Sequence, residues 1–179
     1  MLKKIFFTIM LILLAIFQVS FFSQFNFFQT SLNIILVTVI LITLIREYRV
    51  ALIAAIILGL TLDLYSVYGF GIITLALLLP VIICNNLLQK FFARRSILSL
   101  IFLMLISTLT YNLIILIFTS LSYWLNWNNI YVIFDFNYLI ILLKQSVFNT
   151  TALIFLFTII QYFNKKIRSK FLISENINP

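Results

Sequence analysis

The sequence reads, over residues 59–71, Gly59-Leu60-Thr61-Leu62-Asp63-Leu64-Tyr65-Ser66-Val67-Tyr68-Gly69-Phe70-Gly71. All three glycines of the chain and one of its four acidic residues fall inside this stretch, between two long apolar runs. In an apolar chain, an acid and a cluster of glycines at one point indicate function or special packing. The stretch is therefore the first candidate site, and the sequence on either side defines its setting.

Composition places the chain in a membrane. Of its 179 residues, 64% are hydrophobic and 9% are charged. A soluble domain carries roughly a quarter charged residues, so this chain has too few polar groups to cover a water-facing surface. We therefore expect the lipid bilayer to be its main solvent.

The residue types argue against catalysis and cofactor binding. Histidine is absent and Cys84 is the single cysteine, which excludes an intrachain disulfide and a Cys/His metal site. The acids Glu47, Asp63, Asp135 and Glu175 lie far apart in sequence, and no nucleophile or phosphate-loop motif is present. We expect no enzyme, no catalytic residue, no metal and no cofactor.

Six apolar segments are long enough to cross a bilayer, which needs about 20 mostly apolar residues per helix. Backbone polar groups in lipid must be satisfied within each segment, so we expect helices. The prediction is an all-α polytopic membrane protein with one helical bundle domain over residues 1–179. The expected spans are Ile5–Phe22, Phe27–Ile45, Val50–Tyr68, Phe70–Gln89, Ile97–Leu121 and Tyr138–Phe163.

Basic residues predict the orientation of these spans. Eleven of the twelve lie before the first span, between the second and third, between the fourth and fifth, or after the sixth, which are all on one side of the membrane. They are Lys3, Lys4, Arg46, Arg49, Lys90, Arg94, Arg95, Lys165, Lys166, Arg168 and Lys170. By the positive-inside rule, both termini are expected in the cytoplasm. Because these residues flank apolar runs, the net charge of +8 indicates topology rather than nucleic-acid binding.

Two charges lie inside predicted spans. Asp63 lies thirteen residues into the third span, about 20 Å from its cytoplasmic end at 1.5 Å per residue. Lys144 lies six residues into the sixth span, about 9 Å below the outer surface. The matched depth predicts an ion pair between Asp63 and Lys144. The alternative is that each side chain reaches the headgroups separately.

Other polar residues predict contacts between helices. Asn112 and Asn149 fall at similar depth in the fifth and sixth spans, where they could form an interhelical hydrogen bond; a solute pocket is the alternative. Gly59 and Asp63, four residues apart, share a helix face that allows close backbone approach. Gly69 and Gly71 permit a tight outer turn.

The pattern Gly59-x-x-x-Asp63-x-x-Ser66, followed by Gly69 and Gly71 before the apolar run 72–79, resembles the rod shape-determining protein MreD family. The specific pattern covers only the third and fourth spans, whereas helix number, length and topology fit along the chain. The resemblance implies a non-catalytic scaffold in the bacterial inner membrane that helps position peptidoglycan synthesis and regulate cell shape. Its implied partners are an MreC-like bitopic coiled-coil protein and, through it, MreB and the peptidoglycan synthases.

A transport function is the competing hypothesis. At fold level the family resembles the six-helix substrate-binding subunits of energy-coupling-factor vitamin transporters. Those subunits usually carry Ala-x-x-x-Ala spacing in the first helix, where this chain has Ala15 alone. They also tend to have longer outer loops that close over a vitamin, and Ser122–Asn137 is the candidate for such a lid.

Overall fold

The computed structural model describes residues 2–22, 32–90, 97–125 and 135–175, with side chains described for 5–21, 32–90, 97–125 and 135–163. The described residues form helices and turns without a strand. The helices are α1 (Leu2–Phe22), α3 (Ile34–Ile45), α4 (Tyr48–Asp63), α5 (Ile72–Lys90), α6 (Ile97–Trp124) and α7 (Phe136–Glu175). The expected all-α class is confirmed.

Among the described residues, three helices are long and apolar enough to cross a membrane. They are α5, α6 and the part of α7 from Phe136 to Phe163. The segments Ile5–Phe21 of α1 and Ile34–Ile45 of α3 are shorter apolar helices. This length and composition fit a helical membrane protein.

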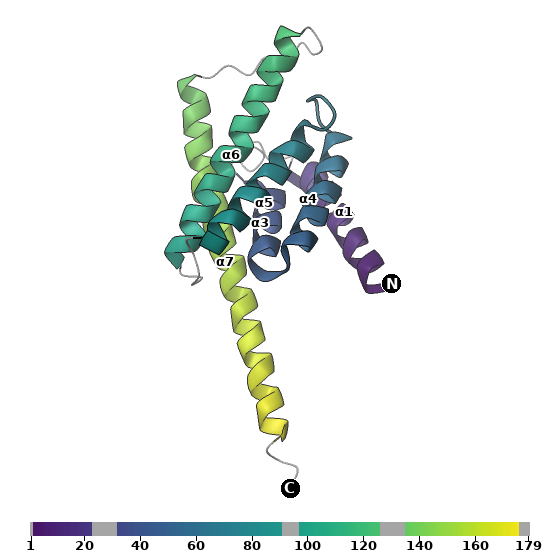
Figure 1. Cartoon of the computed structure of the whole chain (residues 1–179), viewed down its shortest axis with the longest axis vertical. Coiled ribbons are helices and arrows are strands. Elements are labelled where there is room, and N and C mark those ends of the chain that lie inside the picture. Colours follow the sequence, from purple (N-terminus) through teal and green to yellow (C-terminus); the bar gives the residue numbers. More distant parts are fainter. Residues whose placement is uncertain (1, 23–31, 91–96, 126–134, 176–179) are drawn as a thin grey trace.

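The helix ends fall into two groups (Figure 1). The junction of α3 with α4 lies at the same end of the bundle as the last turn of α5 and the first turn of α6. The turn between α4 and α5 and the facing ends of α6 and α7 lie toward the opposite end. Arg46 follows the last residue of α3, Arg49 lies in the first turn of α4 and Lys90 ends α5, so these three basic residues lie at the same end of the bundle.

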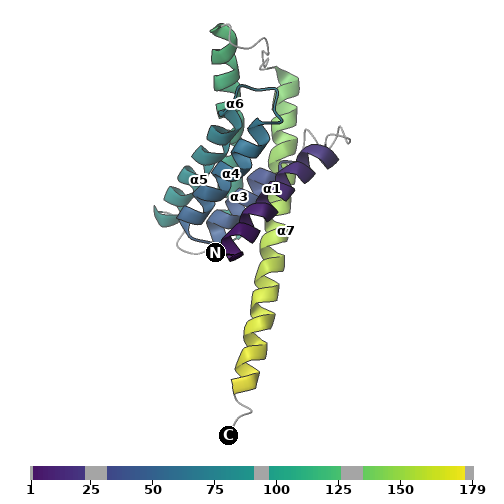
Figure 2. The same ribbon diagram turned by 90° about the vertical axis from the view of Figure 1, so that its right-hand side faces the viewer.

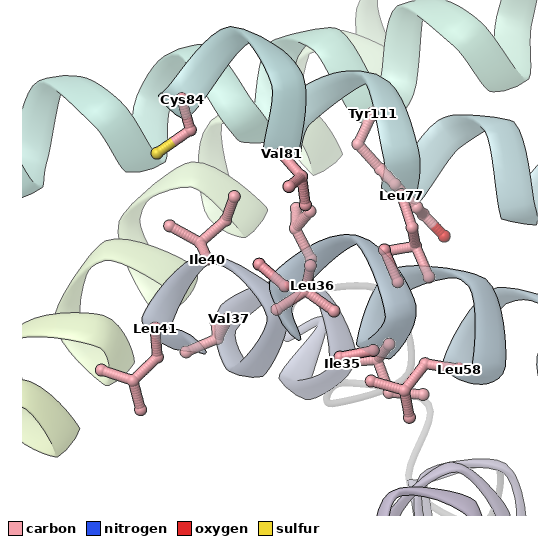
Figure 3. Close-up of a cluster of buried hydrophobic side chains, with 14 of the residues drawn as sticks. Ile35, Leu36, Val37, Ile40, Leu41, Leu58, Leu77, Val81, Cys84 and Tyr111 are labelled. Atoms are coloured by element: carbon pink, nitrogen blue, oxygen red, sulfur yellow. The ribbon is translucent and has the colours of Figure 1, made fainter. Parts of the chain in front are cut away.

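Helix α3 forms the centre of the bundle. It is apolar on all sides, and it packs against α1, α4, α5, α6 and α7, which is the environment that such a helix requires. Figure 3 shows its side chains meeting those of α5, with Leu36 and Val81 near the centre of the buried cluster. Helix α1 crosses the bundle obliquely, and α7 continues beyond the other helices (Figure 2).

The observed helix ends differ from the predicted spans in two informative places. Helix α3 begins at Ile34, seven residues after the predicted start at Phe27; residues 27–31 lie outside the described part of the chain. Helix α4 ends at Asp63, five residues before the predicted end at Tyr68. The side chain of Asn33 caps the start of α3, and the side chain of Asp63, at the end of α4, bonds to the first N–H groups of α5; hydropathy alone detects neither bond.

Candidate functional site

Asp63 caps the helix that follows its own. Its Oδ1 accepts a hydrogen bond from the backbone N–H of Ile73 at 2.9 Å. Its Oδ2 accepts one from the backbone N–H of Thr74 at 3.1 Å and one from the Thr74 hydroxyl at 2.5 Å. The Asp63 side chain is 5% exposed. A carboxylate is favourable here because the N-terminus of a helix carries partial positive charge and unpaired N–H groups.

The turn before α5 completes the cap. The N–H of Ile72 donates to the carbonyl of Gly69 at 3.2 Å, and the N–H of Leu75 donates to the carbonyl of Gly71 at 3.0 Å. With the two bonds to Asp63, all four N–H groups in the first turn of α5 have partners. The first N–H groups of a helix have no partner within the helix, so the carbonyl of Gly69 and the carboxylate of Asp63 satisfy those of Ile72, Ile73 and Thr74.

Gly59 lets α4 and α5 approach closely at this junction. A Cβ atom at position 59 would lie 2.6 Å from the Cα and 2.9 Å from the Oγ1 of Thr74. Gly59 and Asp63 lie one turn apart on α4, and both contact Thr74. The absence of a side chain at position 59 therefore places the α5 N-terminus within reach of the Asp63 carboxylate.

Gly71 and Ser66 shape the turn itself. Gly71 has a φ of +92°, a conformation that L side chains rarely adopt. The Ser66 hydroxyl lies 3.3 Å from the carbonyl oxygens of both Asp63 and Tyr68, to which it donates. All five predicted motif residues, Gly59, Asp63, Ser66, Gly69 and Gly71, thus meet in one structural unit, here called the α4–α5 junction.

The junction has the chemistry of a structural cap. The Asp63 carboxylate is occupied by three donors, and the described residues contain no group of three or more His, Cys, Asp or Glu side chains that could hold a metal ion. Within the described part of the chain, no buried side-chain nitrogen or oxygen lacks a partner. The polar atoms of the junction are therefore used to hold α4 against α5.

The structure does not bring Asp63 and Lys144 together. Asp63 lies in the cap of α5, whereas Lys144 is exposed on α7, and α4 and α7 do not pack against each other in the described chain. The expectation of an ion pair assumed that a buried carboxylate needs a cation. Backbone N–H groups and a hydroxyl fulfil that need for Asp63 instead.

Asn112 and Asn149 both join α6 to α7, but through other partners rather than each other. Asn112 donates to the Oε1 of Gln145 at 2.6 Å and to the carbonyl of Thr108 at 2.8 Å. Asn149, fully buried, donates to the Oγ1 of Thr108 at 3.4 Å. Both asparagines therefore lie in one hydrogen-bond network between α6 and α7, with Thr108 between them.

Sequence reasoning missed a second capped helix end, at the start of α3. The Asn149 Oδ1 accepts from the N–H of Asn33 at 2.9 Å, and the Gln18 Oε1 of α1 accepts from the N–H of Ile35 at 2.9 Å. Asn33 caps its own helix by accepting from the N–H of Leu36 at 2.9 Å. An asparagine directly before an apolar run is a helix-start signal, and it could have located this end.

A hollow of about 480 Å³ adjoins the α4–α5 junction. It lies between α4, α5 and α6, and its lining is mostly apolar: Leu60, Gly69, Phe70, Gly71, Ile72, Thr74, Leu75, Phe118 and Ser122.

Comparison of the chain with protein-family models, with curated proteins and with solved structures returned no match.

Proposed function

We propose that this protein is a non-catalytic scaffold of the bacterial cell-elongation machinery, built as six membrane-spanning helices in the inner membrane with both termini in the cytoplasm. In this proposal α1, α3 and α4 cross the bilayer together with the three long helices. The basic end of the bundle, with Arg46, Arg49 and Lys90, faces the cytoplasm. The protein helps position peptidoglycan synthesis along the cell wall.

The α4–α5 junction is the observation that carries the proposal. The residues that resemble the MreD family are those that cap α5 and allow α4 to approach it. Their polar atoms are directed at the protein's own backbone rather than at an open site. Such an arrangement supports a fixed surface for binding partner proteins rather than a reaction.

The proposed partners follow from the same resemblance. An MreC-like bitopic coiled-coil protein would bind the bundle within the membrane, and MreB and the peptidoglycan synthases would join through it. The lipid bilayer is the remaining partner, since large apolar side chains are exposed on α1, α6 and α7. We propose no nucleic-acid contact.

Depletion in the source bacterium tests this function. We expect depleted rod-shaped cells to become round or swollen, and the tagged protein to co-purify with a single-span coiled-coil protein. The matched variants are Asp63→Ala, expected to lose complementation because it uncaps α5, and Asp135→Ala, expected to complement. Normal cell shape after depletion would reject the scaffold function.

The hollow beside the junction favours one alternative, a substrate-binding subunit of a vitamin transporter of the energy-coupling-factor type. Its position between α4, α5 and α6 would suit a small ligand held at the outer end of the bundle. Native mass spectrometry of the purified protein distinguishes the two functions. The scaffold function predicts the mass of the chain and lipids alone, whereas a stoichiometric vitamin would favour the transporter.

A further inference from the structure

One face of α7 is uncovered and carries a charge. It is here called the Lys144 face and comprises Lys144, Val147, Thr151, Phe155 and Thr158, which follow one another at helical spacing and are all exposed. Val147 and Phe155 are 63% and 64% exposed. Among the three candidate spans, that of α7 is the least covered by the rest of the bundle.

Lys144 has no counter-charge in the described part of the chain. No ion pair or hydrogen bond of its ammonium group is formed there, and Asp63 is enclosed in the cap of α5. Lys144 lies eight residues into α7, about 12 Å along the axis from Phe136. Its stem is shorter than this distance, and an ammonium group left within the hydrocarbon is costly unless it is paired.

A second copy of the chain cannot supply the missing carboxylate from its described residues. Two copies in the same membrane orientation place equivalent residues at equal depth. Asp135 precedes Lys144 by nine residues, which is about 14 Å nearer the outer surface. Its carboxylate is also engaged, because it accepts from the N–H of Tyr138 and from the side chain of Asn137. Glu47 lies at the opposite end of the bundle.

We propose that the Lys144 face docks a transmembrane helix of a different protein, which presents an acidic side chain at the depth of Lys144. Charge complementarity identifies the occupant, because Lys144 needs a carboxylate that this chain does not bring to it. The apolar side chains of Val147 and Phe155 provide van der Waals contact on either side of Thr151. This inference rests on the proposed scaffold function, for which it supplies the surface that contacts the single-span partner.

A designed peptide tests the docking face. The probe is a fluorescent single-span helix of leucine and alanine with one aspartate at the depth of Lys144; a control peptide has leucine there. Both are titrated against the full-length labelled protein in liposomes by energy transfer. We expect the aspartate peptide to bind at least tenfold more tightly than the leucine peptide, and Lys144→Leu to remove this preference.

Matched variants separate docking from general effects. Lys144→Arg should keep the preference, and Lys144→Glu should reverse it in favour of a lysine peptide. The control variant Leu113→Ala should leave the peptide preference unchanged, because Leu113 is exposed on α6 and lies outside the Lys144 face. It is a close control, since its neighbour Asn112 bonds to Gln145, which follows Lys144 in α7. Since Lys144 is exposed, the helical circular dichroism spectrum should be the same in all variants.

Three results would overturn the docking face. The first is equal binding of both peptides, which is expected if Lys144 contacts lipid headgroups. The second is a preference for the aspartate peptide that survives Lys144→Leu. The third is self-association of the labelled protein through this face. If the peptide test fails but depleted cells still become round, the docking face is rejected and the scaffold function stands. A preference for the aspartate peptide with normal cell shape after depletion rejects the scaffold function alone.

Discussion

The carboxylate of Asp63 binds both the backbone N–H and the hydroxyl of Thr74, at 3.1 and 2.5 Å, across a turn that reverses the chain between α4 and α5. One turn earlier in α4, Gly59 lies so close to the same threonine that a Cβ atom at position 59 would not fit. One residue of α5 thus receives both a polar bond and a close backbone contact from one face of α4.

Removing the charge of Asp63 should destabilise the protein. In Asp63→Asn, one side-chain oxygen remains to accept, while the amide N–H₂ group faces the donors of α5. Loss of hydrogen bonds from a buried charged group is expected to lower the free energy of unfolding by about 1.5–3 kcal/mol. Unfolding in mixed micelles with increasing sodium dodecyl sulfate measures this. Asp135→Asn, at an exposed helix start, is the control and should cost less.

A side chain at position 59 should separate α4 from α5. Gly59→Ala places a Cβ 2.6 Å from the Cα of Thr74, so backbone must move, and we expect a loss of about 1–3 kcal/mol. Because the nearest atom belongs to the backbone, Thr74→Ala should fail to rescue Gly59→Ala. The same micelle titration of the single and double variants checks this. Full rescue by Thr74→Ala would contradict the close helix contact.

Gly71 isolates the effect of backbone conformation. A Cβ at this position meets nothing within 4 Å, yet φ is +92°. Gly71→Ala should therefore cost about 1–3 kcal/mol through backbone strain alone. Asparagine tolerates positive φ better than alanine does, so Gly71→Asn should unfold at a detergent fraction between those of wild type and Gly71→Ala. Equal stability of all three proteins would argue against this turn geometry.

The two asparagines between α6 and α7 should differ in importance. Asn149→Ala removes both a bond to Thr108 and the partner of the Asn33 N–H at the start of α3, whereas Asn112→Ala removes bonds within the α6–α7 pair. We expect Asn149→Ala to cost about 1–2 kcal/mol, and Asn112→Ala about half of that. Detergent unfolding followed by tryptophan fluorescence compares them. The reverse order would contradict the role of Asn149 at α3.

Much of this architecture was predictable from sequence, and the predictions that were wrong have identifiable physical reasons. Apolar runs located the helices, and the glycines and acid of residues 59–71 located the turn between α4 and α5. The partner of Asp63 was not predictable by matching charges, because backbone N–H groups leave no compositional signal. The start of α3 at Ile34 was missed because hydropathy does not register a helix-start signal such as that of Asn33.

The central claim is that Asp63 acts as the cap of α5. Amide hydrogen exchange by nuclear magnetic resonance, on the full chain in micelles, measures it directly at Ile73 and Thr74. The cap predicts slow exchange of both amides in wild type and at least tenfold faster exchange in Asp63→Asn, with a smaller change at Leu75, whose N–H bonds to Gly71. Equal exchange of the Ile73 and Thr74 amides in the two proteins would contradict it.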